Sequence, residues 1–180
     1  LMAPTEILAE QHFGNICPPL EAMAEHIQAQ DYIRSLHIAR LPRPLGVALL
    51  TGSLGDRQKE EVQQGIAAGQ IDLVIGTHAL IHRQDSFKQI GLVIIDEQHR
   101  FGVAQRAKLI EKASIADRDK LSPHVLTMTA TPIPRTVALT VYGNLDISTL
   151  DQMPPGRKTV KTHYVPTGKR RACHQWIKKQ

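Results

Sequence analysis

The chain has 180 residues, 42% of them hydrophobic and 22% charged, a composition that suits a folded protein and excludes wholesale disorder. Its 22 lysine and arginine residues outnumber its 17 aspartate and glutamate residues, and the net charge of +5 favours polyanionic partners such as nucleic acid. With one tryptophan, three tyrosines and three phenylalanines, a base-stacking platform is a poor prediction.

Short apolar runs alternate with longer amphipathic patterns, an order typical of βαβ units around a parallel sheet. We expect strands at 45–50, 71–75, 91–95 and 125–128, and helices at 57–68, 103–113 and from about 135. Asp56 is expected to cap the first of these helices, and Gly69 to end it. The run at 91–95 is apolar on both faces, which predicts a central strand covered by helices on both sides.

The segment from 18 to 44 carries a weaker helical pattern. Leu20, Met23 and Ile27 follow two prolines at the spacing of one helix face, which predicts a helix there. Apolar residues between 32 and 38 continue this pattern less cleanly, until a proline-containing stretch just before residue 45 ends it.

A Pro-Pro-Gly sequence gives residues 153–160 the composition of a linker. We therefore divide the chain into a first lobe at 1–152, this linker, and the start of a second lobe at 161–180. In the second lobe we expect a strand at 161–165 and a helix at 169–179.

Both ends of the chain look cut, because Leu1 is not a methionine and Gln180 lies in a basic amphipathic stretch. We therefore expect a part of a larger protein. The chain has no charged-then-apolar leader and no apolar run near the ~20 residues that span a bilayer. Cys17 and Cys173 show no metal or redox spacing, so a reduced cytoplasmic protein is expected.

Two adjacent acids, Asp96 and Glu97, follow the apolar strand at the end where open α/β sheets bind ligands. Carboxylates there are costly unless they meet a cation or transfer a proton. In a nucleotide hydrolase Asp96 would hold Mg²⁺, usually through water, and Glu97 would orient and deprotonate the attacking water. Two alternatives are a pair of surface acids that caps the next turn, and a metal-dependent hydrolase that also uses His99.

Thr129 and Thr131 flank a small residue directly after the strand at 125–128. Their hydroxyls are expected to hydrogen-bond the neighbouring acidic loop and to change partners as nucleotide is hydrolysed. The alternative is that Thr131 caps a helix whose first residue is Pro132, a common pairing at helix starts.

Small hydroxyl or glycine residues also stand at three other expected strand ends: Pro4 and Thr5; Thr51, Gly52 and Ser53; Gly76, Thr77 and His78. Backbone N–H groups and short hydroxyls suit phosphate oxygens, and they hold a nucleic-acid strand without reading its bases. Each group alone is an ordinary turn. Their recurrence at one side of one sheet predicts a phosphate-binding edge.

Five segments in this order resemble motifs of the superfamily 2 helicases: 1–9, 50–53, 76–78, 96–103 and 128–136. Gln98 and the segment at 150–157 are more narrowly similar to the RecG family of ATP-dependent helicases, which remodel branched DNA. The transcription-repair coupling translocases (Mfd-like) are similar but typically carry glutamate in place of Gln98. They remain an alternative.

The resemblance implies part of a RecA-like (P-loop NTPase) motor lobe, a parallel sheet with flanking helices that here lacks the P-loop strand and helix. It also implies ATP and Mg²⁺ as cofactors. The implied partner is branched or forked DNA, and the implied processes are recombination and repair. The protein would act as a monomer in the bacterial cytoplasm, at the nucleoid. The three strand-end groups would grip the DNA backbone, and Asp96 and Glu97 take the Mg²⁺ and catalytic-base positions. Four further residues match positions that couple hydrolysis to lobe movement: Gln98, His99, Thr129 and Thr131.

The chain contains no Gly-x-x-x-x-Gly-Lys sequence followed by serine or threonine, the pattern of a P-loop that cradles nucleotide phosphates. The 180 residues alone are therefore expected to be inactive, and the full-length parent to hydrolyse ATP. A non-catalytic nucleic-acid-binding module that has lost its phosphate site is the remaining alternative.

Overall fold

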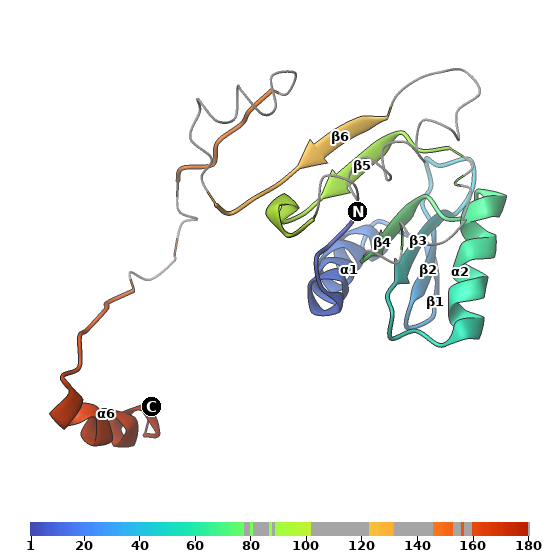
Figure 1. Cartoon of the computed structure of the whole chain (residues 1–180). Helices are drawn as coiled ribbons and strands as arrows, with labels where there is room; N and C mark the ends of the chain where they lie inside the picture. The colour runs from blue at the N-terminus through green and yellow to red at the C-terminus, as the bar shows by residue number, and fades with distance from the viewer. Residues whose placement is uncertain are drawn as a thin grey trace. The chain divides into compact units, whose positions relative to one another are not determined.

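The computed structural model describes residues 1–77, 80, 87, 89–101, 123–131, 146–152, 156 and 160–179. The chain divides into two compact units, Leu1–Pro132 and Ile133–Gln180. Within the described ranges, the first unit carries a sheet flanked by helices and the second carries a short helix (Figure 1). The lobe boundary expected at residue 152 stays a prediction.

Strands of the first unit form one mixed sheet. Four of them lie side by side in sequence order: β1 (His26–Ala29), β2 (Ile33–His37), β3 (Leu45–Leu50) and β4 (Leu73–Gly76). Two others form a pair: β5 (Leu92–Ile95) and β6 (His124–Thr127). Met2 joins the two parts, since it makes parallel bridges to Gly76 and to Ile95. The strands β3 to β6 therefore run in one direction, as expected. β2 is antiparallel to both of its neighbours, β1 and β3.

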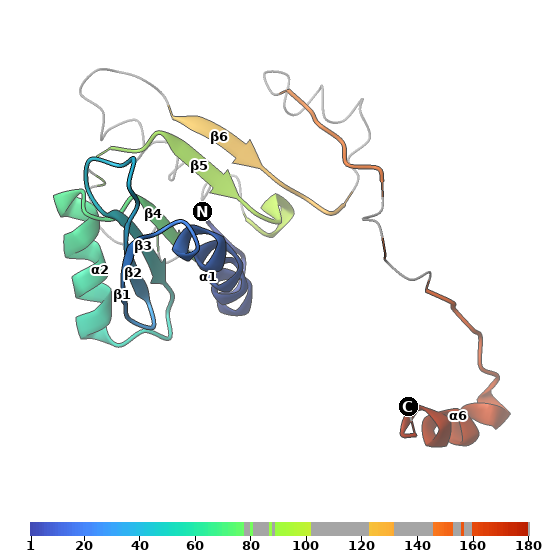
Figure 2. The same cartoon turned by 180° about the vertical axis from the view of Figure 1, so that it is seen from behind.

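The helices α1 (Glu6–Glu21) and α2 (Asp56–Ala68) lie on opposite sides of β1–β4 (Figure 1 and Figure 2). Ala9, Phe13 and Cys17 form the buried stripe of α1, at the spacing of one helix face. Residues 46–50 of β3 are all buried, which matches a strand covered on both faces. This double cover explains why the run at 45–50 is continuously apolar.

The ends of α2 differ in how well they were predicted. Gly69 has a left-handed φ of 71° and confirms the expected end of the helix. The cap is Gly55 and not Asp56, because the Gly55 N–H donates to Oε1 of Gln58 at 2.9 Å and leaves Asp56 inside the first turn. The negative charge of Asp56 still suits the start of a helix there.

The helix predicted after Pro18 is wrong. α1 already runs through Pro18 to its end, and the chain then forms the β1–β2 hairpin. Leu36, which is fully buried, pairs with Ile27 in β1 and with Leu45 in β3. Residues that fit one helix face thus act as cross-strand neighbours, because pairing with β3 outweighs the local spacing.

Side-chain contacts fix the hairpin against both helices. The Arg34 guanidinium lies 5.2 Å from the ring centre of Phe13 in α1, and its Nε donates to Oε1 of Glu21 at 2.8 Å. The Tyr32 hydroxyl donates to Oε2 of Glu61 in α2 at 2.6 Å. The segment between α1 and β3 is therefore an integral part of the first unit.

β5 is covered less than expected. Val93 and Ile95 are buried, but Leu92 is 56% exposed and Ile94 is only half-buried. The helices described in this unit pack mainly against β2, β3 and β4, so they leave one face of β5 open within the described ranges. The expectation of burial on both faces is wrong for Leu92, and the helices expected to follow β5 lie outside the described residues.

In the second unit, α6 (Arg170–Ile177) confirms the helix predicted at 169–179. Residues 161–165 form no strand, and among the described residues of this unit no second strand is present to pair with them. A lone strand leaves its backbone groups unpaired, which explains the error. The helices predicted at 103–113 and from 135 lie outside the described residues. No described helix is long and apolar enough to cross a membrane.

Candidate functional site

The residues singled out in the sequence gather at one edge of the sheet. Because β3, β4, β5 and β6 are parallel and Met2 runs with them, their carboxyl ends meet at the same side. Thr51, Thr77, Asp96 and Thr129 follow these ends, and Thr5 follows the Met2 strand segment. The structure thus collects the predicted site residues that it describes along this edge, where open sheets bind ligands.

A tight turn shapes the acidic segment after β5. The Asp96 N–H donates to the Met2 carbonyl at 2.9 Å, and Oδ1 of Asp96 accepts from the Glu97 N–H at 2.9 Å. Glu97 has a left-handed φ of 48°, the one positive φ among the described non-glycine residues. Such a conformation costs ~1–3 kcal/mol and persists where the surroundings enforce it. A short 3₁₀ helix, Gln98–Arg100, follows the turn.

Backbone and side-chain contacts join the acidic segment to the threonine segment. The Gln98 N–H donates to the Met128 carbonyl at 2.9 Å, and the Met128 N–H donates to the Ile95 carbonyl at 2.8 Å. Oε2 of Glu97 accepts from the Ala130 N–H at 3.5 Å, a long hydrogen bond. The two segments are therefore neighbours, which the proposed coupling between them requires.

The threonines themselves hold the second segment in shape. Oγ1 of Thr129 accepts from the Thr131 N–H at 3.2 Å, which closes a small turn. Thr131 is exposed, and the helix that it would cap lies outside the described residues. Gln98 is 7% exposed. The backbone of His99 lies in the 3₁₀ helix, and its side chain is outside the described part.

His12 is a site residue that the sequence reasoning missed. Its Nε2 lies 2.8 Å from Oδ2 of Asp96, and the two side chains are 27% and 20% exposed. The helical spacing held a signal, because Thr5, Ala9 and His12 follow one another at the intervals of one helix face. His12 therefore connects α1 to the acidic segment.

The second phosphate-binding group lies close to Glu6, the residue that follows Thr5. Oγ1 of Thr5 caps α1 by accepting from the Leu8 N–H at 3.3 Å. Gly52 is exposed, and a Cβ there would lie 2.5 Å from Oε1 of Glu6. The Gly52 carbonyl accepts from Nζ of Lys59 at 2.7 Å. Pro4 is half-buried, so Thr5 and Gly52 present the open part of this surface.

Two of the expected phosphate ligands are buried. Thr51 is fully buried, and its hydroxyl lies 2.9 Å from that of the exposed Ser53. Thr77 is 2% exposed, its N–H donates to the Leu50 carbonyl at 3.4 Å, and its hydroxyl oxygen has no partner among the described residues. Gly76 packs directly on Leu50, and His78 lies outside the described residues. The DNA-binding roles of this group stay predictions.

The described side chains fit a Mg²⁺ ion that arrives with nucleotide better than one caged by protein. Among the described residues, no three His, Cys, Asp or Glu side chains cluster at ligand spacing. Mg²⁺ commonly takes one or two carboxylates, and waters and substrate phosphates complete its coordination. Asp96 supplies such a carboxylate at the sheet edge.

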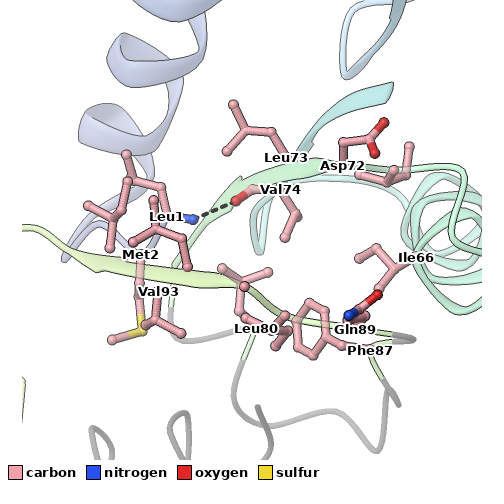
Figure 3. A pocket seen from close by; sticks show the side chains of 15 residues that line it. Leu1, Met2, Ile66, Asp72, Leu73, Val74, Leu80, Phe87, Gln89 and Val93 are labelled. Carbon is pink, nitrogen blue, oxygen red and sulfur yellow. Dashed lines mark hydrogen bonds between the residues drawn. The ribbon is translucent and has the colours of Figure 1, made fainter. Parts of the chain in front are cut away.

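The first unit also contains a pocket of about 400 Å³ (Figure 3). Its lining is mostly apolar and comes from α2, β4, β5 and the segment before β5. Leu1 lines it, and its amino group donates to the Val74 carbonyl at 2.7 Å. No acid, threonine or histidine of the candidate site lines the pocket.

Known proteins resemble this chain over most of its length. Residues 1–140 match the family model for DEAD/DEAH box helicases. The chain is 42% identical over 180 residues to the ATP-dependent DNA helicase RecG of Synechocystis sp. and covers 18% of that protein. It is 47% identical over 165 residues to the ATP-dependent DNA helicase RecG of Mycobacterium bovis, a match that covers 92% of this chain and 21% of that protein.

A solved structure agrees with the sequence matches. The structure of RecG bound to a three-way DNA junction aligns with a TM-score of 0.66 at 38% identity, covering 98% of this chain and 20% of the matched chain. The present chain thus spans about a fifth of the length of the curated relatives it matches. The matched positions occupy a small part of these much longer proteins.

Proposed function

The chain belongs to the DEAD/DEAH box helicase family, and from this premise we propose that it forms part of the first motor lobe of a RecG-type, ATP-dependent DNA helicase. The α/β architecture with parallel strands is that of the predicted RecA-like fold. The proposed substrate is branched DNA, such as forks and Holliday junctions, in recombination and repair. RecG, which this chain resembles, is bound to a three-way DNA junction in its solved structure.

One observation supports the motor role above the others. The acidic segment and the threonine segment are hydrogen-bonded neighbours at the carboxyl edge, through Gln98 and Met128. In the proposed site Glu97 orients the attacking water and accepts its proton, and Asp96 holds Mg²⁺ through water. The ion would neutralise phosphate charge when it is bound. Four residues couple this site to lobe movement in the proposal: Gln98, His99, Thr129 and Thr131.

The DNA contacts in this proposal are electrostatic and independent of base sequence. Three groups hold the phosphates of the tracking strand: Pro4 and Thr5; Thr51, Gly52 and Ser53; Gly76, Thr77 and His78. The buried Thr51 and Thr77 act through the backbone of their turns, and exposed groups such as Ser53 make the direct contacts.

The wider organisation follows from the same proposal. The motor lobe covers 1–152, a linker covers 153–160, and the second lobe begins at 161–180. The parent protein acts as a monomer in the bacterial cytoplasm, at the nucleoid where its DNA lies. ATP is bound through a P-loop outside these 180 residues.

Replacing the proposed base tests the function in the full-length protein. Glu97→Gln keeps the size of the side chain and removes its basicity, so DNA-stimulated ATP hydrolysis should fall ~10²–10⁴-fold. Glu10→Gln removes the same charge from an exposed position on α1 and should leave turnover unchanged. Wild-type turnover in Glu97→Gln would show that Glu97 is not the base.

Two further outcomes decide between this proposal and its alternatives. A wild-type protein that binds DNA without hydrolysing ATP would be a non-catalytic module. Equal turnover on forked and unbranched duplex DNA would favour a translocase of the transcription-repair coupling type. A clear preference for forked DNA supports the helicase of branched DNA.

A further inference from the structure

We propose that His12 is a positioning residue that couples the DNA-facing start of α1 to the Asp96 carboxylate. This inference rests on the proposed function, since it assigns Asp96 to the nucleotide site and Thr5 to the DNA surface. It adds a residue that lies in none of the five helicase-like segments. The fold brings His12 of α1 to the acidic segment.

The two oxygens of Asp96 are held from different directions. Oδ1 accepts from the Glu97 N–H at 2.9 Å, within the turn after β5. Oδ2 lies 2.8 Å from Nε2 of His12, on a helix from the far end of the sequence. Two contacts on one carboxylate fix both its rotation and its tilt, so movement of α1 relative to β5 must change the position of Oδ2.

α1 is suited to carry such movement over a useful distance. Thr5 caps the helix, and His12 follows seven residues later, about 10 Å along the axis at 1.5 Å per residue. Ala9 and Phe13 are buried on either side of His12 in sequence, so this part of the helix packs firmly on the sheet. A contact at the exposed Thr5 is thereby connected to the acidic segment through a short rigid element.

A second tie strengthens this connection. The Asp96 N–H donates to the Met2 carbonyl at 2.9 Å, and Met2 lies just before Pro4 and Thr5. The leading strand segment therefore contacts the backbone of Asp96 while the helix after it contacts the side chain. DNA binding at Thr5 and nucleotide binding at Asp96 share this one structural unit, and they should influence each other reciprocally.

The test uses equilibrium binding by the full-length protein, so hydrolysis is not the readout. We would measure the affinity for a non-hydrolysable ATP analogue with Mg²⁺, with and without forked DNA. The wild-type ratio should lie in the ~5–150-fold range typical of such coupling. His12→Phe keeps a ring but removes the nitrogen, and it should bring the ratio close to one. DNA affinity without nucleotide should stay at its wild-type value.

Two variants serve as controls. His12→Gln places an amide nitrogen near the position of Nε2 and should restore most of the ratio. Gln11→Ala changes the exposed neighbour on α1 and should leave the ratio intact. If His12→Phe proves unstable, His12→Leu replaces it in the same measurement.

A wild-type ratio in both His12→Phe and His12→Leu would overturn the inference, as would a wild-type protein whose nucleotide affinity ignores DNA. Tighter nucleotide binding by His12→Phe in both conditions would also overturn it, because His12 would then merely block the carboxylate. These results leave the Glu97→Gln experiment untouched. Failure of the coupling is therefore distinct from failure of the proposed function.

Discussion

Adding one methyl group at Gly76 tests how closely the sheet is packed beside the candidate site. A Cβ there would overlap the carbonyl oxygen of Leu50, and it would lie 3.2 Å from the Leu50 carbonyl carbon and 3.1 Å from Cγ of Leu80. Backbone atoms cannot rotate away, so β3 and β4 would have to separate where Met2 also bridges to Gly76. Overpacking typically costs ~1–3 kcal/mol, and we expect Gly76→Ala near the upper end.

The same substitution at Gly14 supplies a matched control of opposite sign. Gly14 lies inside α1, and a Cβ there would meet no atom within 4 Å apart from its chain neighbours and the helix's own backbone. Alanine is favoured over glycine in a helix interior by ~0.5–1 kcal/mol, so Gly14→Ala should stabilise α1. The two variants should therefore differ by at least about 2 kcal/mol in local stability.

Hydrogen exchange of the full-length protein is the suitable assay, because it reports opening free energies for separate segments. Amides of β3 and β4 should lose protection in Gly76→Ala, while amides of α1 should gain it in Gly14→Ala. Unchanged protection of β3 and β4 in Gly76→Ala would refute the close approach of these two strands.

Three other predictions concern the hairpin and the DNA surface. Leu36→Ala should destabilise the first unit by ~2–5 kcal/mol because Leu36 is fully buried, whereas Met23→Ala, at a residue 64% exposed, should change hydrogen-exchange protection little. The hydrogen bond to Glu61 raises the pKa of Tyr32, so the folded state favours the neutral phenol. This contribution to stability is present below the ordinary tyrosine pKa and is lost as the pH rises through the higher folded value; Tyr32→Phe should remove the alkaline loss, as followed by thermal unfolding against pH. DNA binding by the full-length protein should weaken steeply with added salt and be alike for duplexes of different base sequence, and a strong sequence preference in a fluorescence titration would contradict phosphate recognition.

Elements with a strong local pattern were predictable. The continuous apolar run of β3 and the left-handed stop at Gly69 depend on residues close together in sequence. The hairpin was not predictable in this way, because Leu36 is placed by its partners in β1 and β3 and not by its own spacing. Leu92 shows the same limit, since its exposure depends on which helices cover β5.

The candidate site also contains residues that a local pattern predicts and residues that only the fold places. Asp96, Glu97 and the two threonines could be found because each follows a recognisable strand. For His12 the sequence held only the helical spacing from Thr5, and its contact with Asp96 depends on where Met2 enters the sheet. The burial of Thr77 was equally unpredictable, because small hydroxyl residues at strand ends can be either buried or exposed.

Insertion of Met2 between strands from distant parts of the sequence also sets an order of assembly. β1 to β4 come from neighbouring stretches and can pair early, as contacts between near residues form fastest. Within the described part of the chain, β5 and β6 join the sheet through Met2, after ribosomal synthesis has passed residue 127. The half of the sheet that carries Asp96 and Glu97 is therefore completed last, after β1 to β4 can already have paired.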